Sequence, residues 1–507
     1  MVAPALVRRR CDLPLVVVGV VLSAVGRPAP APASPSPVSP SSVVSEEMML
    51  VETEALARAV GEARKARVVV DWERRLVDRT EARAIAEAVV RDAVAAGGDR
   101  ADSEVDAQVF LRLGLLTTSD ARYADLISAA AARDPVGFYD PTARRLYVPS
   151  YIPLPEQRLV LAHEIAHALQ DQRFGLRRFL KITPDGRRGL SVDAELARQA
   201  VIEGDAAVLA LEAVDPRALF PAPPELAEVA QRARAGLAGT AADRPESPVS
   251  PVSPRFLREL LAFPTLEGFT FVARARGRAS WAAIDAIWAR PPESTAQILH
   301  PEKYDRRVSA AGLEIPPLPL MGDGWRWARA ETFGELLLRV WLSSERAAAG
   351  WRGDRMAIYL PAIPPAPPGG DVAGAGGGDA GSSEAGGAGA GAALAWLTAW
   401  DGEADADDFL QAVVPRLAAL AAGGAAPEPG APADTSGQPV VWHARADDTI
   451  YAAARRGALV ALLLGAPPAA LPSLATMLDG PRPGAPSRRG VRAAPDAKAG
   501  DRPRATR

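Results

Sequence analysis

Residues 156–172 read EQRLVLAHEIAHALQDQ, and this stretch carries most of the chemical information in the 507-residue chain. Its apolar residues recur at helical spacing and two prolines precede it, so we expect one continuous helix. Positions i and i+4 share a helix face, so His163 and His167 can direct both imidazoles at one ion. Glu164 lies about 100° around the helix from His163. It would therefore lie beside such an ion, where a carboxylate can take a proton from water.

The remaining ligand has to come from another part of the chain. A catalytic zinc site uses three protein ligands and leaves one position open. The one cysteine, Cys11, stands at the N-terminus, so the ligands are expected to be His, Asp or Glu. The extended pattern HExxHxxGxxH is absent, because Arg173 stands where its last histidine would be. We therefore predict a carboxylate as third ligand and Zn²⁺ as cofactor, with other divalent ions as alternatives.

A second long helix is expected over residues 191–212. Its carboxylates are Asp193, Glu195, Glu203, Asp205 and Glu212. Glu203 lies in the apolar segment AVIEGDAAVLA, where a buried charge requires a strong partner such as a metal ion. Glu195 has a more polar setting that water can solvate, so we favour Glu203 as the ligand. Asp205 is a candidate hydrogen-bond partner of a ligand histidine; a helix-packing or capping role is the alternative.

Three segments, HEIAHALQDQ (163–172), IEGDA (202–206) and STAQILHPEKY (294–304), carry a family resemblance. Together they resemble the gluzincin type of HExxH zinc metallopeptidase, and more narrowly a group of poorly characterised exported bacterial and archaeal proteins with HELxHALQDQ, EGDA and HPEKY motifs. The likeness covers roughly residues 75–304 and continues through 348–355. It implies a zincin-like fold, with His163, His167 and Glu203 as zinc ligands and Glu164 as general base. The chain departs from the pattern at Ala296, where an acidic residue is expected.

Peptide hydrolysis at such a site needs a second electrophile for the carbonyl oxygen. The candidates are His300, Tyr304, Tyr139 and Tyr147. Of these, His300 and Tyr304 are the predicted catalytic partners of Glu164, although a structural role for the histidine is the alternative. Residues 146–148 are expected to form a short strand, in a hairpin or at a sheet edge, that could bind a substrate backbone by strand addition. Tyr139 and Tyr147 are therefore the predicted substrate-binding residues.

The N-terminal segment has the pattern of an export signal. Three arginines precede the apolar run LPLVVVGVVLSA at residues 13–24, which suits a signal peptide or an uncleaved membrane anchor. We therefore expect an extracytoplasmic protein, secreted or anchored to the membrane by this segment. The expected segments are a signal peptide or anchor (1–26), a Pro/Ser-rich linker (27–45), a zincin-like metallopeptidase domain (46–310), a distal αβ region (311–478) with a Gly-rich insertion (364–391), and a disordered tail (479–507).

Composition excludes little else. The formal charge of −3 and a pI near 6.0 favour no nucleic-acid partner. The expected fold is α+β and helix-rich, with a zincin-like core and a distal αβ portion. The favoured function is an exported zinc-dependent peptidase acting on a peptide or protein substrate. The alternatives are a non-catalytic envelope binding protein, which has no need of Glu164, and a zinc hydrolase of a non-peptide amide; the sequence leaves the oligomeric state open.

Overall fold

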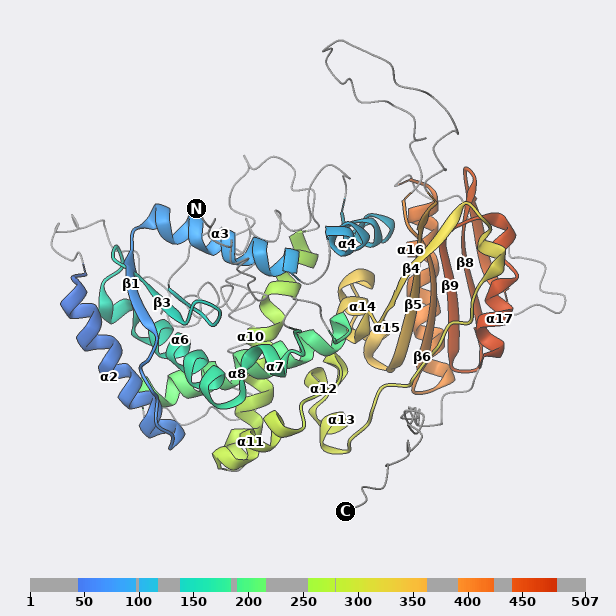
Figure 1. Ribbon diagram of the computed structural model, residues 1–507. Helices are drawn as coiled ribbons and strands as arrows, with labels where there is room; N and C mark the ends of the chain where they lie inside the picture. The colour runs from blue at the N-terminus through green and yellow to red at the C-terminus, as the bar shows by residue number, and fades with distance from the viewer. Residues whose placement is uncertain are drawn as a thin grey trace, which may run out of the picture.

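Figure 1 shows the computed structural model, a mixed α+β fold with a helix-rich part beside a large sheet. The structure describes residues 44–96, 100–116, 137–183, 189–215, 254–278, 280–362, 391–423 and 440–480. The predicted signal or anchor at 1–26 lies outside the described residues. So do the linker up to residue 43, the Gly-rich insertion up to residue 390 and the tail from residue 481. None of the described helices combines the length and apolarity needed to cross a bilayer.

The helix-rich part holds three short strands among its helices. The strands are β1 (Glu73–Val77), β2 (Phe138–Asp140) and β3 (Arg145–Pro149). The helices are α2 (Glu46–Arg64), α3 (Arg79–Ala96), α4 (Arg100–Arg112), α6 (Leu154–Phe174), α7 (Leu176–Phe179), α8 (Val192–Val214), α10 (Pro254–Arg278), α11 (Trp281–Ala289), α12 (Thr295–Leu299) and α13 (Pro301–Asp305).

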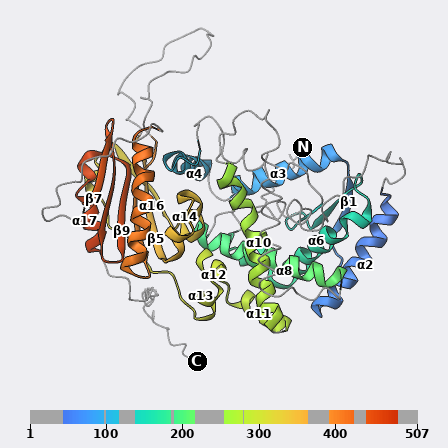
Figure 2. The same cartoon turned by 180° about the vertical axis from the view of Figure 1, so that it is seen from behind.

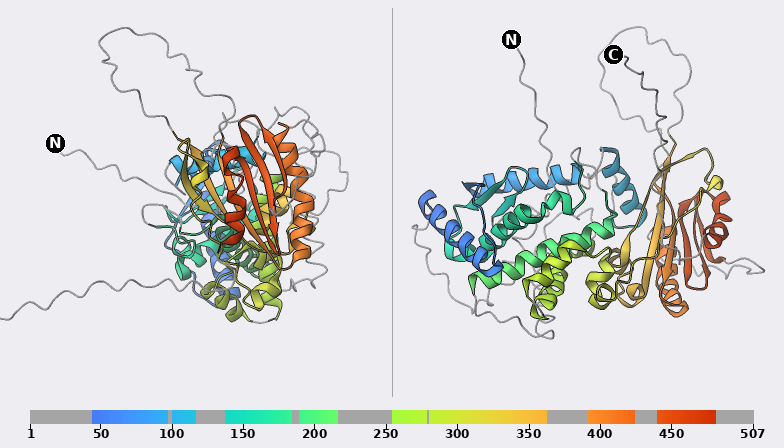
Figure 3. Two further views of the ribbon diagram at one scale, coloured as in Figure 1. Left: turned by 90° about the vertical axis from the view of Figure 1, so that its right-hand side faces the viewer. Right: turned by 60° about the horizontal axis from the view of Figure 1, so that its bottom comes forward.

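Both helices predicted to carry the site are confirmed. The stretch at 156–172 lies within the single helix α6, whose middle is completely buried. The stretch at 191–212 lies in α8, where Ser191 caps the start by accepting a hydrogen bond from the amide of Ala194. α8 packs against both α6 and α10, as the right-hand view of Figure 3 shows.

Two glycines bring α8 and α10 into backbone contact. A Cβ placed on Gly204 of α8 would lie 2.1 Å from the carbonyl oxygen of Gly268 in α10. A Cβ on Gly268 would lie 2.1 Å from the carbonyl oxygen of Ala200. Any larger side chain at either position would push the helices apart. Gly204 therefore fixes α8 against α10, one position after the predicted ligand Glu203.

The small sheet has the order β1-β3-β2. The predicted hairpin is confirmed, because β2 pairs antiparallel with β3, with Tyr139 opposite Leu146. The alternative that residues 146–148 form an edge strand is wrong, because β3 also pairs in parallel with β1. Strand addition at β3 is therefore excluded, since both of its sides already have partners. Among the described strands, β2 and β1 are the edges of this sheet.

The distal part is a six-stranded antiparallel sheet with the order β4-β5-β6-β9-β8-β7. The strands are β4 (Trp325–Glu331), β5 (Trp351–Pro361), β6 (Ala393–Trp400), β7 (Val440–Ala446), β8 (Thr449–Arg456) and β9 (Leu459–Ala466). The helical segments are α14 (Gly334–Leu342), α15 (Arg346–Ala349), α16 (Glu403–Ala421), α17 (Ser473–Asp479), η2 (Pro319–Met321) and η3 (Pro468–Ala470). Viewed from behind, α16 runs along one face of the sheet (Figure 2), and α17 packs on the opposite face.

One continuous buried cluster joins the two parts. It includes side chains of α6 and α8, then α14, and then the face of β5, β6 and β9 that α16 covers.

Polar contacts cross the same junction. The indole of Trp341 donates to the carbonyl oxygen of Leu113, and Arg112 donates to the hydroxyl of Tyr451. Asp354 of β5 is buried there, and it accepts hydrogen bonds from the amides of Phe333 and Gly334 and from the indoles of Trp351 and Trp396. The sheet and the helices therefore share a core.

Candidate metal centre

The structure brings His163, His167 and Glu203 together in the interior. The Oε2 atom of Glu203 lies 3.3 Å from Nε2 of His163 and 3.7 Å from Nε2 of His167. One possible ligand atom from each residue lies within 4.8 Å of the others, and all three residues are buried. In the part of the chain that the structure describes, no other group of three such residues meets this criterion.

The spacing and the chemistry of these atoms fit a metal ion. Ligands about 2.0–2.2 Å from a tetrahedral ion lie roughly 3.3–3.6 Å apart, close to the separations from Glu203. Nε2 of both histidines and Oε2 of Glu203 are also buried without a hydrogen-bond partner in the structure. Leaving buried polar atoms unpaired costs about 1–3 kcal/mol each, and a cation among them would remove this cost. The His-His-Glu group could therefore hold a metal ion.

The electrostatics of the three residues suit the same role. Burial, together with the charge of His167, lowers the pKa of His163 to about 4, so this imidazole is neutral. Burial alone would lower the pKa of His167 as well, but the carboxylate of Glu203 raises it to about 9. The two imidazoles outweigh burial at Glu203 and lower its pKa, so this carboxylate is ionised. The cluster therefore favours one positive charge, as a proton on His167 or as a metal ion.

Glu164 lies on the same helix turn and is fully buried. Its Oε2 atom accepts a hydrogen bond of 2.8 Å from the backbone amide of Tyr139 in β2, while Oε1 has no partner. Burial raises the pKa of Glu164 to about 8. A carboxyl group that titrates near neutral pH suits general acid–base chemistry.

Asp205 does not contact either histidine directly. Its Oδ2 atom accepts hydrogen bonds from the indole of Trp288 at 2.8 Å and from the amide nitrogen of Gln170 at 3.4 Å. Gln170 in turn meets Nδ1 of His167 at 2.9 Å. The predicted contact between Asp205 and a ligand histidine therefore runs through Gln170, a residue that the sequence reasoning passed over. Its position three residues after His167, on the same helix face, was the available signal.

Among the described residues, His300 and Tyr304 make no contact with His163, His167, Glu203 or Glu164. Nε2 of His300 lies 2.7 Å from Oε1 of the buried Glu335 in α14. The hydroxyl of Tyr304 donates to the carbonyl oxygen of Arg290. Segment 295–299 before them packs against the start of α8, where Thr295 bonds Asp193. Asp193 precedes Glu203 by ten residues on α8, which corresponds to about 15 Å along a helix.

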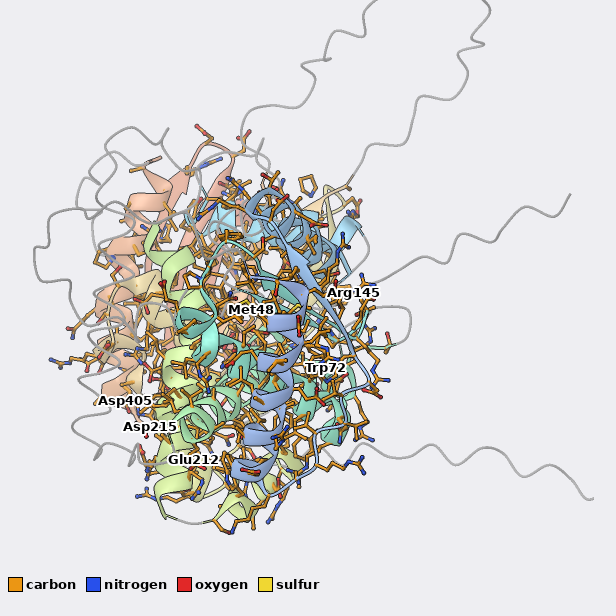
Figure 4. The ribbon with its side chains drawn as sticks, turned by 90° about the vertical axis from the view of Figure 1, so that its left-hand side faces the viewer. Met48, Trp72, Arg145, Glu212, Asp215 and Asp405 are labelled. Atoms are coloured by element: carbon orange, nitrogen blue, oxygen red, sulfur yellow. The ribbon has the colours of Figure 1, made fainter. Side chains whose placement is uncertain are left out.

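The two tyrosines of the small sheet have separate surroundings. Tyr147 is buried, its ring packs against Phe138, and its hydroxyl accepts a hydrogen bond from Arg145. Figure 4 labels Arg145 at the surface of this side of the molecule. Tyr139 is also buried, and its hydroxyl faces Arg144. It is therefore the backbone of Tyr139, rather than its side chain, that meets the site at Glu164.

Comparisons with known proteins bear on the other end of the chain. Residues 325–475 match a domain of unknown function, DUF8575. This range covers the six-stranded sheet and contains none of the residues of the metal centre. No curated protein and no solved structure matches the chain.

Proposed function

We propose that this chain is a zinc-dependent peptidase with a zincin-like core and a gluzincin ligand set. The observation that carries the proposal is Glu164, a fully buried carboxyl group beside the His-His-Glu group, whose Oε1 atom has no hydrogen-bond partner. Two histidines and one carboxylate form a known catalytic zinc set that leaves a coordination position open. His163, His167 and Glu203 would hold the ion.

Each residue then has a defined task. Zinc, when bound, supplies Lewis-acid activation of water and of the peptide carbonyl. Glu164 accepts a proton from the attacking water while the oxygen of that water forms a bond to the carbonyl carbon. It then delivers that proton to the amide nitrogen as the C–N bond breaks, which leaves an acid and an amine. The amide of Tyr139 holds the Glu164 carboxylate in place throughout.

The edge strand β2 is the proposed place for the substrate backbone. The amide of Tyr139 points away from β3, because it donates to Glu164 on α6. The outer side of β2 therefore faces the metal helix. A substrate backbone added to this edge would lie beside Glu164 and pair with the groups of β2 that Glu164 does not already occupy.

The rival function is a binding protein of the cell envelope that keeps the centre without catalysis. A structural metal site has no use for Glu164, whose desolvation is unfavourable when ionised. We therefore favour the enzyme. An exported, extracytoplasmic setting belongs to the same proposal, and so does N-terminal anchoring, but both depend on residues outside the described part of the chain. No nucleic-acid partner is proposed.

The test is hydrolysis of a mixed peptide library by the zinc-loaded chain and two variants. Glu164→Gln removes the base but keeps the side-chain volume, and we expect it to abolish cleavage with zinc content unchanged. Glu156→Gln is the matched control, because Glu156 is exposed in the first turn of the same helix. Cleavage that survives in Glu164→Gln would refute the assigned base. A folded, zinc-loaded parent that cleaves no peptide would favour the binding protein.

A further inference from the structure

Gln170 joins the two helices that supply the metal ligands. It lies one turn after His167 on α6 and is 2 % exposed. Its Oε1 atom lies 2.9 Å from Nδ1 of His167. Its Nε2 atom lies 3.0 Å from the carbonyl oxygen of Ile202, which immediately precedes Glu203 on α8. One buried amide therefore contacts a ligand residue on one helix and the backbone beside a ligand on the other.

The hydrogen-bond partners fix which way the amide faces. The carbonyl oxygen of Ile202 can only accept a hydrogen bond, so the NH₂ group of Gln170 must point toward it. The carboxylate of Asp205 lies on the same side of the amide and also accepts. The oxygen of Gln170 consequently faces His167, and the imidazole must carry its proton on Nδ1. In the neutral form that binds a metal ion, the lone pair of the ring then lies on Nε2, the atom that faces Glu203.

The other ligand histidine has no such support. Nδ1 of His163 is buried and has no hydrogen-bond partner in the structure. Its tautomer is therefore not set by a neighbour in the same way. Of the two Nδ1 atoms, that of His167 therefore has a hydrogen-bond partner, Gln170, and that of His163 has none among the described residues.

We infer that Gln170 is a positioning residue of the metal centre. It selects the His167 tautomer that presents Nε2 to the ion, and through Ile202 it sets the distance between the ligands of α6 and α8. Asp205 acts through Gln170, because its carboxylate accepts a hydrogen bond from the amide of Gln170 and another from the indole of Trp288. The inference rests on the proposed metal site and is independent of peptide hydrolysis.

Metal affinity tests this role without any activity assay. We would measure the zinc dissociation constant by competition with a chromogenic chelator for Gln170→Met, which has a similar length but lacks the amide. Loss of a partner that orients a metal-bound histidine typically weakens binding about 10–100-fold, and we expect a loss in that range. Gln172→Met is the matched control, because Gln172 lies on the same helix but bonds the backbone of Val69 and Arg67 near the surface. We expect its affinity to equal that of the parent.

A second variant separates tautomer selection from packing. Gln170→Glu keeps an acceptor for the Nδ1 proton but loses the donor to Ile202, so it is made together with Asp205→Asn, which removes the carboxylate that would face it. We expect this double variant to bind zinc within about tenfold of the parent. We also expect its cobalt-substituted form to keep the visible spectrum of the parent, and the spectrum of Gln170→Met to change. If the double variant loses more than about tenfold in affinity, the tautomer role is overturned, whether or not the methionine variant folds.

The remaining outcomes are also decisive. Parent-like affinity in Gln170→Met would overturn the inference and leave the metal site standing. A parent chain that binds no zinc would overturn both.

Discussion

Nε2 of His163 and Oε2 of Glu203 lie 3.3 Å apart in the interior of the molecule, although they belong to different helices. The carboxylate is ionised, whereas the imidazole is neutral because burial lowers its pKa to about 4. A neutral imidazole and an ionised carboxylate are the forms in which both residues bind metals. The pair could therefore serve as two ligands of one ion.

Zinc should stabilise the folded chain, and the effect should require Glu203. A ligand present at about 1,000 times its dissociation constant stabilises the native state by about 4 kcal/mol. We expect added zinc to raise the thermal unfolding midpoint of the parent but not that of Glu203→Gln. Glu195→Gln is the control, because Glu195 is also buried on α8 and the sequence offered it as the rival ligand. A parent-like shift in Glu203→Gln would contradict the assignment.

The contact between α8 and α10 should tolerate no side chain. Gly268→Ala would place a methyl group against the carbonyl oxygen of Ala200, and we expect a loss of about 1–3 kcal/mol or more in unfolding free energy. Gly277→Ala is the control on the same helix, where an added Cβ meets nothing within 4 Å. We expect that change to be neutral or to stabilise by up to about 1 kcal/mol. Denaturant unfolding measures both, and equal effects would contradict the close packing.

Asp193 should make stability fall as pH rises. The pKa of this carboxyl group is raised to about 7, mainly by burial. Hydrogen bonds from Thr295 lower the pKa in part, and the nearby Asp354 and Glu335 add to the rise. A folded-state pKa above the unfolded value gives stability that is present below about pH 4 and is lost as pH rises through about 7. The parent should therefore lose up to about 4 kcal/mol relative to Asp193→Asn over this range. Unfolding free energies at pH 4.5 and 8 measure the difference, and a constant difference would contradict the shifted pKa.

The sequence predicts the site well because its information is local. The helical spacing of His163 and His167 and the apolar surroundings of Glu203 can be read within single segments. The two helices that they predict are confirmed, and their ligand atoms meet. The hairpin before α6 is likewise a local feature, in which β2 and β3 follow each other.

The features that the sequence does not predict depend on contacts between distant segments. β3 is a central strand because residues 73–77 pair with it, and nothing within 146–148 indicates that partner. His300 meets Glu335, which lies in the part of the chain assigned to the distal region. Gln170 reads as one of two amides, with Gln172, in a polar helix end, and its role depends on the carbonyl group of Ile202 across the helix interface.

The most direct test of the metal-dependent peptidase is a zinc titration of the chain after its metals have been removed with a chelator. Bound zinc and the rate of peptide cleavage are measured at each addition. The metal-free chain should be inactive, and the rate should rise in proportion to bound zinc until the site formed by His163, His167 and Glu203 is filled. Full cleavage by the metal-free chain, or no cleavage of any peptide after this site has filled, would contradict the account.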